Sequence, residues 1–399
     1  MSGPAVFFGA ARYRRRSYND NHPLGIPRVS LTIDLLQAYG ALPEAEYQES
    51  RPAADCELAW FHTEEYLRAA RRIDASGRAS AEDRKRYNLG NLENPVFADF
   101  FTTAATATGA SIQAAEAVLA GRIGFNPAGG MHHAAPHQAR GFCYFNDPVL
   151  GILRLRREGW RVLYVDLDAH HGDGVEEAFA GDPEVFTLSL HMGTDRAYPF
   201  TGGGLEDRGR GPGAGFSLNL PMPTGAHDDD YRAAFGGIWG PITDRFQPDA
   251  VVLQAGTDIL LPDPLSRFRI STQTFLEMTA RIQADAAPRL LVTGGGGYHP
   301  LALARCWAGL WAQLSGRDLP VALPEAGRAH MEAVDWDLDD EEEDWFDELF
   351  RSRLDPPQPG PVKPEVTEAL DRLRRHHPYL QRPAPTPGAT VANPEPVSE

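Results

Sequence analysis

A short run of carboxylates and imidazoles at positions 166–173 carries the most evident chemistry in this sequence. Asp166, Asp168, His170 and Asp173 follow the apolar, β-branched-rich stretch 161–165, which is typical of a strand buried in a parallel sheet. Side chains two residues apart along a strand point the same way. Asp168 and His170 can therefore bind one metal ion, with Asp166 behind them. We predict a metal-binding strand end.

A third metal ligand is expected from another strand end. A mononuclear metal hydrolase needs three protein ligands and an open position for water. Asp258 follows the predicted strand 250–254 and completes the set with Asp168 and His170, although a lone Asp after a strand is more often a helix cap or turn residue. Two carboxylates and one imidazole suit Zn²⁺ or Fe²⁺, so both metals stay open.

Two adjacent histidines, His132 and His133, lie in a glycine-rich stretch upstream. Such pairs are usually incidental. Here Asp166 and Asp173 are not needed as metal ligands, and each can accept a hydrogen bond from one imidazole. That contact fixes the tautomer and raises basicity, which is the arrangement expected of general acid/base histidines.

A tyrosine, Tyr298, follows a run of four glycines, 294–297. Such a run is often only a tight turn, but it also lets a ligand approach the backbone closely. A phenol placed there can donate a hydrogen bond to a developing oxyanion. The run lacks the lysine and hydroxyl residue of a phosphate-binding loop.

Strand-like and helix-like segments alternate along the chain. The strands we expect are 6–8, 162–167, 185–190, 217–220, 250–254 and 290–293. The helices we expect are 28–39, 55–72, 97–120, 148–158, 175–180, 229–244, 272–287 and 301–314, with 77–93 a polar loop. This alternation predicts an α/β fold with an open parallel sheet, helices on both faces and sites at the carboxyl ends of the strands.

Composition narrows the class of protein. The 399 residues are 42% hydrophobic, with a formal net charge of -17. An acidic chain is not expected to bind nucleic acid or anionic membranes, because phosphate neutralisation needs clustered Lys and Arg. Three cysteines far apart fit neither a disulfide framework nor a Cys-x-x-Cys zinc site, and a reducing cytoplasm is the expected location. No apolar run is long enough to span a bilayer.

Two segments near the end of the chain differ from the rest. Residues 335–350 are strongly acidic but contain aromatic and aliphatic residues, which predicts an amphipathic segment packed on a catalytic domain of residues 1–380; a dedicated partner surface is the alternative. Residues 381–399 are proline-rich without apolar periodicity, and we expect a disordered tail.

Taken together and in order, the motifs resemble those of the histone deacetylase superfamily. They are Gly-Gly-Met-His-His, Gly-Phe-Cys-Tyr-Phe-Asn-Asp, Asp-Leu-Asp-Ala-His-His-Gly-Asp-Gly and Gly-Gly-Gly-Gly-Tyr, within residues 5–320. The closest likeness is to the bacterial acetoin-utilization (AcuC-like) branch. The resemblance implies the arginase/deacetylase-like fold, a single domain with one open parallel sheet flanked by helices.

The resemblance also implies residue roles. The metal ligands, usually of zinc, are Asp168, His170 and Asp258. The catalytic residues are His133 as general base and acid backed by Asp173, His132 as its electrostatic partner backed by Asp166, and Tyr298 on the acetyl carbonyl. The substrate-binding residues are Gly141, Phe142 and Tyr198 in the tunnel wall and Leu265 and Glu93 at its rim. A structural K⁺ is held by Asp166, Asp168, His170, Ser189 and Leu190.

The leading functional hypothesis is a metal-dependent deacetylase acting on N-ε-acetyl-lysine in an acetylated protein or peptide. An acetylpolyamine amidohydrolase is the nearest alternative, and a non-catalytic acetyl-lysine-binding protein comes from a different class. An arginase-like dimetal hydrolase is disfavoured, because Gly172 and Gly256 stand where that arrangement needs further carboxylates. Oligomeric state and physiological substrate stay open.

Overall fold

The structure is a computed structural model that describes residues 5–15, 17–19, 21–336 and 348–381. Most of the acidic segment predicted at 335–350, and all but the first residue of the tail predicted at 381–399, therefore lie outside the described residues. Within the described part of the chain, no helix is both long and apolar enough to cross a membrane.

The described residues form one sheet of eight strands, all paired in parallel. The strands are β1 Val6–Gly9, β2 Tyr47–Glu49, β3 Gly124–Asn126, β4 Val162–Asp166, β5 Val185–Met192, β6 Ser217–Met222, β7 Ala250–Gln254 and β8 Leu290–Thr293. Their order across the sheet is β2-β1-β3-β8-β7-β4-β5-β6. The expected open parallel sheet is confirmed.

The helices occur between the strands and after them. They are α1 Arg28–Ala38, α2 Asp55–Leu58, α3 Glu64–Ser76, α4 Ala81–Tyr87, α5 Phe100–Leu119, α6 Asp147–Arg156, α7 Asp173–Phe179, α8 Asp228–Phe246, α9 Thr272–Ala286, α10 Pro300–Leu314, α11 Glu325–Glu332 and α13 Pro364–His376.

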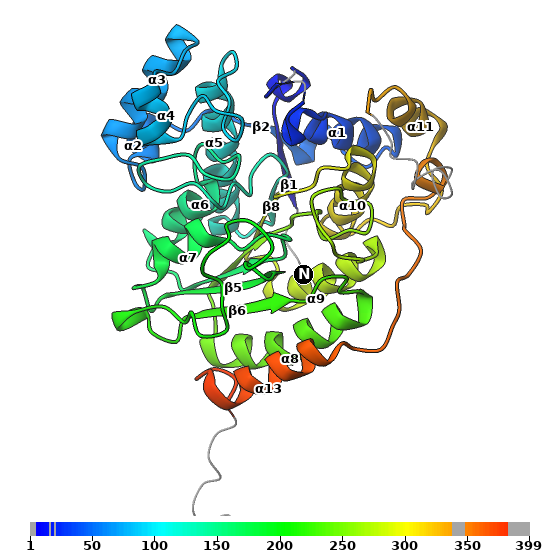
Figure 1. Cartoon of the computed structure of the whole chain (residues 1–399). Helices are drawn as coiled ribbons and strands as arrows, with labels where there is room; N and C mark the ends of the chain where they lie inside the picture. Colours follow the sequence, from blue (N-terminus) through cyan, green and yellow to red (C-terminus); the bar gives the residue numbers. More distant parts are fainter. Residues whose placement is uncertain (1–4, 16, 20, 337–347, 382–399) are drawn as a thin grey trace, which may run out of the picture.

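A separate layer of helices covers each face of the sheet, and the alternating side chains of β4 pack against both layers. Successive side chains of a strand point to opposite faces. Val162 and Tyr164 pack with α5, α6 and α7, whereas Leu163 and Val165 pack with α1, α8, α9 and α10 on the other face (Figure 1). All five residues of β4 are buried, as expected for a central parallel strand.

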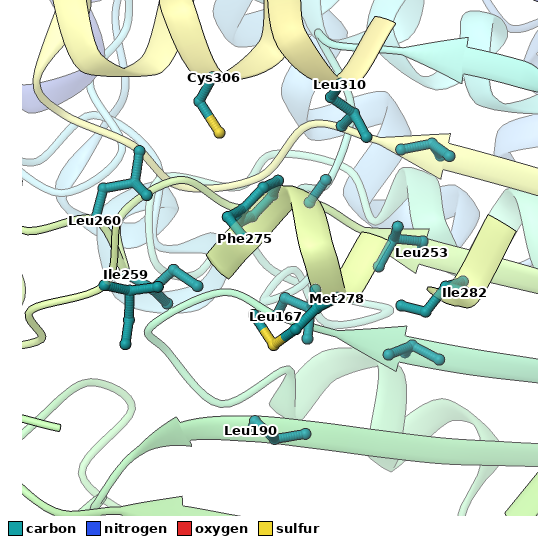
Figure 2. Close-up of a cluster of buried hydrophobic side chains, with 14 of the residues drawn as sticks. Leu167, Leu190, Leu253, Ile259, Leu260, Phe275, Met278, Ile282, Cys306 and Leu310 are labelled. Atoms are coloured by element: carbon teal, nitrogen blue, oxygen red, sulfur yellow. The ribbon is translucent and has the colours of Figure 1, made fainter. Parts of the chain in front are cut away.

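The second face holds a dense apolar core (Figure 2). Leu167, directly after β4, belongs to the same buried cluster as Phe275 and Met278 of α9 and Cys306 of α10, and none of them exposes more than 3% of its surface. This packing matters for function because it holds the chain rigidly at the point where β4 ends and the polar residues begin.

Two expectations about the elements were wrong. The helix expected at 55–72 is two helices, because Thr63 accepts a hydrogen bond from the Tyr66 amide and starts α3 afresh. The polar loop expected at 77–93 contains α4, whose start is a capping box between Ser80 and Asp83. Both are local capping signals. The three-residue strands β2 and β3 were also missed.

Candidate active site

The three expected metal ligands meet at the carboxyl edge of the sheet. Asp168 and His170 follow β4 and Asp258 follows β7, and these strands are neighbours. One potential ligand atom from each lies within 4.8 Å of the others; His170 Nδ1 is 2.9 Å from Asp258 Oδ2 and 3.1 Å from Asp168 Oδ1. Both carboxylates are buried. This donor set fits a divalent metal ion with an open coordination position.

The other carboxylate oxygens of this cluster accept hydrogen bonds from residues at or just after the ends of strands. Asp168 Oδ2 accepts hydrogen bonds from Gln254 Nε2 at 2.7 Å and from the Gly296 amide at 2.6 Å. Asp258 Oδ1 accepts one from the Ala169 amide at 2.9 Å. Sequence reasoning assigned Gln254 no role. Its position as the last residue of a buried strand beside β4 was the available signal.

The glycines at 172 and 256 lie against the carboxylates. A Cβ at Gly256 would collide with Asp168, and a Cβ at Gly172 would collide with Asp166. A side chain at either position would force the neighbouring carboxylate to shift. The absence of extra carboxylates there, noted in the sequence, therefore has a steric reason.

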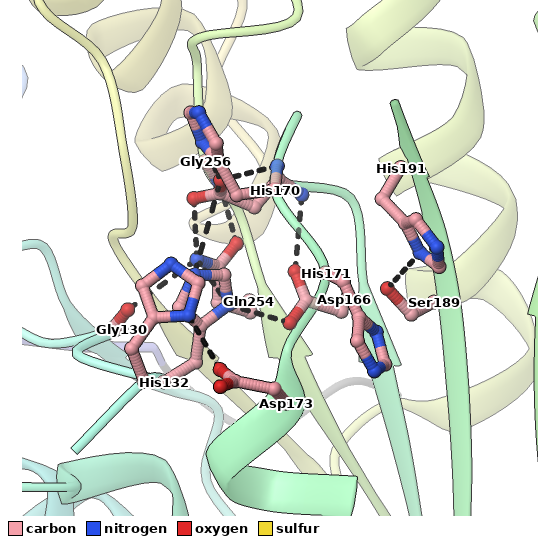
Figure 3. Close-up of polar contacts among 12 residues, drawn as sticks. Gly130, His132, Asp166, His170, His171, Asp173, Ser189, His191, Gln254 and Gly256 are labelled. Carbon is pink, nitrogen blue, oxygen red and sulfur yellow. Dashed lines mark hydrogen bonds and ion pairs between the residues drawn. The ribbon is translucent and has the colours of Figure 1, made fainter. Parts of the chain in front are cut away.

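The paired histidines occupy a loop between β3 and α6, and each meets its expected carboxylate. His132 Nδ1 is 2.8 Å from Asp166 Oδ2 (Figure 3). His133 Nδ1 is 2.6 Å from Asp173 Oδ1. The two Nε2 atoms are 3.0 Å apart. All four side chains are buried.

The surroundings of the two imidazoles shift their pKa values in opposite directions. Burial disfavours the charged form of His132, but Asp166 and Asp168 outweigh it and raise its pKa to about 9. Burial and the neighbouring His132 lower the pKa of His133 to about 4, despite Asp173. These surroundings favour the charged form of His132 and the neutral form of His133, a ring able to accept a proton.

The N-cap and the first residue of α6, Asn146 and Asp147, hold the histidine loop in place. The Asn146 side-chain Nδ2 donates to the carbonyl oxygens of His132 at 3.1 Å and Ala134 at 3.0 Å. The Asp147 carboxylate accepts from the amides of Gly130 at 3.0 Å and Met131 at 2.8 Å. Sequence analysis quoted Asn146 and Asp147 only as the end of the Gly-Phe-Cys-Tyr-Phe-Asn-Asp motif and did not predict that they support the histidine loop.

A cavity of about 420 Å³ leads from the surface toward the metal-ligand cluster. The expected substrate-binding residues that line it are Glu93, Gly141, Phe142, Tyr198 and Leu265, together with Tyr298. The Phe142 and Tyr298 ring centroids are 6.1 Å apart, and those of Tyr198 and His133 are 4.7 Å apart. The cavity therefore has aromatic walls.

The backbone turns sharply where it forms one of these walls. Gly141 and Phe142 both have positive φ, 53° and 69°, and a Cβ at Gly141 would collide with His133. The Gly141 amide donates to Glu93 Oε1 at 2.5 Å. Glu93 thus braces the wall, a contact that the expected rim position did not include.

The residues expected to bind K⁺ lie on or directly after β4 and on its neighbour β5. Asp166 of β4 is in register with Ser189 of β5, and Leu190 follows. Ser189 Oγ and His191 Nδ1 are 2.8 Å apart (Figure 3). The structure brings Asp166, Ser189 and Leu190 together beside the metal-ligand cluster.

Comparison with known proteins fits this geometry. A model of the histone deacetylase domain matches residues 22–314 of the chain. The chain belongs to the histone deacetylase family. Histone deacetylase 8 of Xenopus tropicalis is 39% identical over 309 residues, which cover 77% of this chain and 83% of that protein. The acetoin utilization protein AcuC of Bacillus subtilis (strain 168) is 32% identical over 322 residues, 79% of this chain and 83% of that protein.

Solved histone deacetylase homologues share the fold as well. The crystal structure of a histone deacetylase homologue from Aquifex aeolicus is 41% identical and superposes with a TM-score of 0.89 over 92% of this chain and 99% of that one. A structure of a homologue complexed with SAHA gives the same values. Metal dependence is a property of the family, and the described residues hold a matching ligand cluster.

Proposed function

We propose that this deacetylase hydrolyses N-ε-acetyl-lysine in proteins or peptides. The observation that carries the proposal is the convergence, at the inner end of one aromatic-walled cavity, of the Asp168, His170 and Asp258 cluster with a neutral His133 and the phenol of Tyr298. Metal ligands, a proton acceptor and an oxyanion donor are the parts that amide hydrolysis needs.

The ligand cluster would hold Zn²⁺, with Fe²⁺ as the alternative. When bound, the metal ion supplies Lewis acidity toward water and the acetyl carbonyl. Gln254 and the Gly296 amide keep Asp168 in place through its second oxygen. We assign K⁺ to the neighbouring oxygen-rich site of Asp166, Asp168, His170, Ser189 and Leu190.

Proton transfer falls to the histidine pair. His133 takes a proton from the attacking water and returns it to the departing lysine amine, with Asp173 orienting its ring through the 2.6 Å contact at Nδ1. His132, held as a cation by Asp166, stabilises negative charge that develops in the transition state.

Tyr298 is assigned to the acetyl oxygen. Its ring lies edge-on to His170, with centroids 6.5 Å apart, and burial raises the pKa of its phenol well above the usual value. The hydroxyl thus keeps its proton at neutral pH. It donates a hydrogen bond as the carbonyl oxygen becomes negative.

The cavity mouth favours an acetyl-lysine peptide over an acetylpolyamine. Its exposed residues include Phe200, Leu265, Arg196 and Arg267. The one carboxylate in the cavity lining, that of Glu93, already accepts hydrogen bonds from Gly141 and Asn88. A polyamine carries further cationic amines that need carboxylate partners, whereas a lysine alkyl stem needs only apolar walls.

The test is metal analysis coupled to kinetics on two substrates. We expect hydrolysis of an acetyl-lysine peptide with kcat/KM well above that for acetylputrescine, and loss of most turnover in Tyr298→Phe. A preference for acetylputrescine would establish the polyamine alternative. Normal turnover in Tyr298→Phe would contradict the mechanism.

A further inference from the structure

A buried carboxylate outside the metal-ligand cluster, that of Asp263, joins the rim of the cavity to Tyr298. Its Oδ2 accepts a hydrogen bond from the Tyr298 amide at 2.7 Å. Its Oδ1 accepts one from the Leu265 amide at 2.9 Å. Asp263 is only 6% exposed. The sequence places it between two prolines, 262 and 264, and nothing above gives it a function.

The chain before Tyr298 is held by hydrogen bonds at Gly296, and Gly297 separates that point from the tyrosine. The Gly296 amide bonds Asp168 at 2.6 Å, and its carbonyl accepts from the Thr257 amide at 2.9 Å. Gly297 comes next, with φ +135°, a backbone conformation that L side chains rarely adopt. A glycine joint of this kind leaves the direction of the following residue undetermined by local preference.

The Tyr298 side chain is buried, but its polar end has no specific anchor in the described part of the chain. Its hydroxyl makes no hydrogen bond with any described residue, and its ring contacts with Phe142 and His170 are edge contacts at 6.1 and 6.5 Å between centroids. The main-chain hydrogen bond to Asp263 therefore acts together with the start of α10 at Pro300 in fixing the backbone from which the phenol projects.

We infer that Asp263 is a positioning residue for the reaction: it holds Tyr298 in the orientation that stabilises the oxyanion and ties that orientation to the rim at Leu265. This inference rests on the role proposed for Tyr298. Leu265 is 40% exposed and lines the cavity, where the proposed peptide substrate would contact it. The Asp263 carboxylate thus connects Leu265 at the rim of the cavity to Tyr298 at its base.

The first variant that tests the inference is Asp263→Asn. The amide keeps one acceptor oxygen but turns an NH₂ group toward the second backbone amide, so one of the two hydrogen bonds is lost. We expect kcat on an acetyl-lysine peptide to fall about 10- to 100-fold, as for a slightly misplaced catalytic group. KM and metal content should change little, because the cavity walls and metal ligands are untouched.

A double-mutant cycle separates positioning from general stability. In a Tyr298→Phe background the phenol is gone, so Asp263→Asn should lower single-turnover rates by less than about twofold if it acts through that phenol. The matched control is Asp249→Asn, a change at a carboxylate that accepts a 2.8 Å hydrogen bond from the Arg161 amide at the opposite end of β4 and β7, and it should leave kcat unchanged.

The outcomes distinguish this inference from the proposed function. Unchanged kcat in Asp263→Asn, or losses that multiply in the double mutant, would overturn the positioning role and leave lysine deacetylation standing. Full turnover by Tyr298→Phe alone would overturn the positioning role and the oxyanion role of Tyr298 but not lysine deacetylation, whereas no hydrolysis of the acetyl-lysine peptide by the wild type would overturn the proposed function. If Asp263→Asn does not fold, Asp263→Glu, which keeps both acceptors but moves them by one methylene, takes its place in the same cycle.

Discussion

The imidazoles of His132 and His133 face each other with their Nε2 atoms 3.0 Å apart, and each turns its Nδ1 toward a carboxylate of its own. Two neighbouring histidines therefore lie in different electrostatic surroundings. The buried Asp166 favours the charged form of His132, and that charge in turn lowers the pKa of His133. Such a divergence of pKa values is what separates an electrostatic group from a proton acceptor.

Loss of the neutral imidazole should remove proton transfer. We expect His133→Ala to lower kcat on an acetyl-lysine peptide by about 100- to 10,000-fold, the usual contribution of general acid–base catalysis, with metal content retained. The control is His137→Ala, which removes an exposed histidine from the same loop. Comparable rates in the two variants would argue against His133 as the base.

Removal of the metal should abolish activity. After treatment with a chelator we expect no hydrolysis, and readdition of Zn²⁺ or Fe²⁺ should identify the metal that restores it. Asp258→Asn should retain much less metal than Asp195→Asn, an exposed control, when both are measured by elemental analysis. Full activity of metal-free protein would contradict the assigned ligand cluster.

The packing of Gly256 against Asp168 makes a steric prediction. In Gly256→Ala the new methyl group would collide with the Asp168 carboxylate, so metal occupancy and kcat should both fall. Gly181→Ala is the matched control, because a Cβ there meets nothing within 4 Å. Equal metal content in the two variants would show that Asp168 can move aside without losing the ion.

Acid should destabilise the fold through His62. This buried histidine accepts a 3.0 Å hydrogen bond from the Asn146 amide, and burial lowers its pKa from 6.5 to about 3. Between those pH values the unfolded chain binds more protons than the native state, so the free energy of unfolding falls as pH drops from about 6.5 toward 3. At about 1.4 kcal/mol per pKa unit, the contribution amounts to a few kcal/mol.

Denaturant titrations at several pH values measure this effect. His62→Gln keeps an acceptor for the Asn146 amide but does not titrate, so its unfolding free energy should depend less on pH than that of the wild type below pH 6.5. Parallel curves for the two proteins would show that His62 does not contribute to acid sensitivity.

The metal ligands and the paired histidines were accessible from the sequence because their signals are local. Asp168, His170 and Asp258 each follow an apolar strand run, and the carboxyl ends of parallel strands converge at one edge of a sheet. The helix boundaries were predicted wrongly where polar capping residues start a helix, at Thr63 and at the Ser80–Asp83 pair. Capping starts a helix without changing the apolar periodicity on which the prediction relied.

The sequence by itself determined which residue types follow the strands and converge at the carboxyl edge of a parallel sheet, because strand periodicity and the alternation of strands with helices are local patterns. Tertiary structure decided how they act. Which histidine is charged depends on burial and on carboxylates 34 and 40 positions away, and the orientation of Tyr298 depends on Asp263, 35 positions away. Contacts of that range, and the desolvation that sets their strength, exist only once the chain has folded.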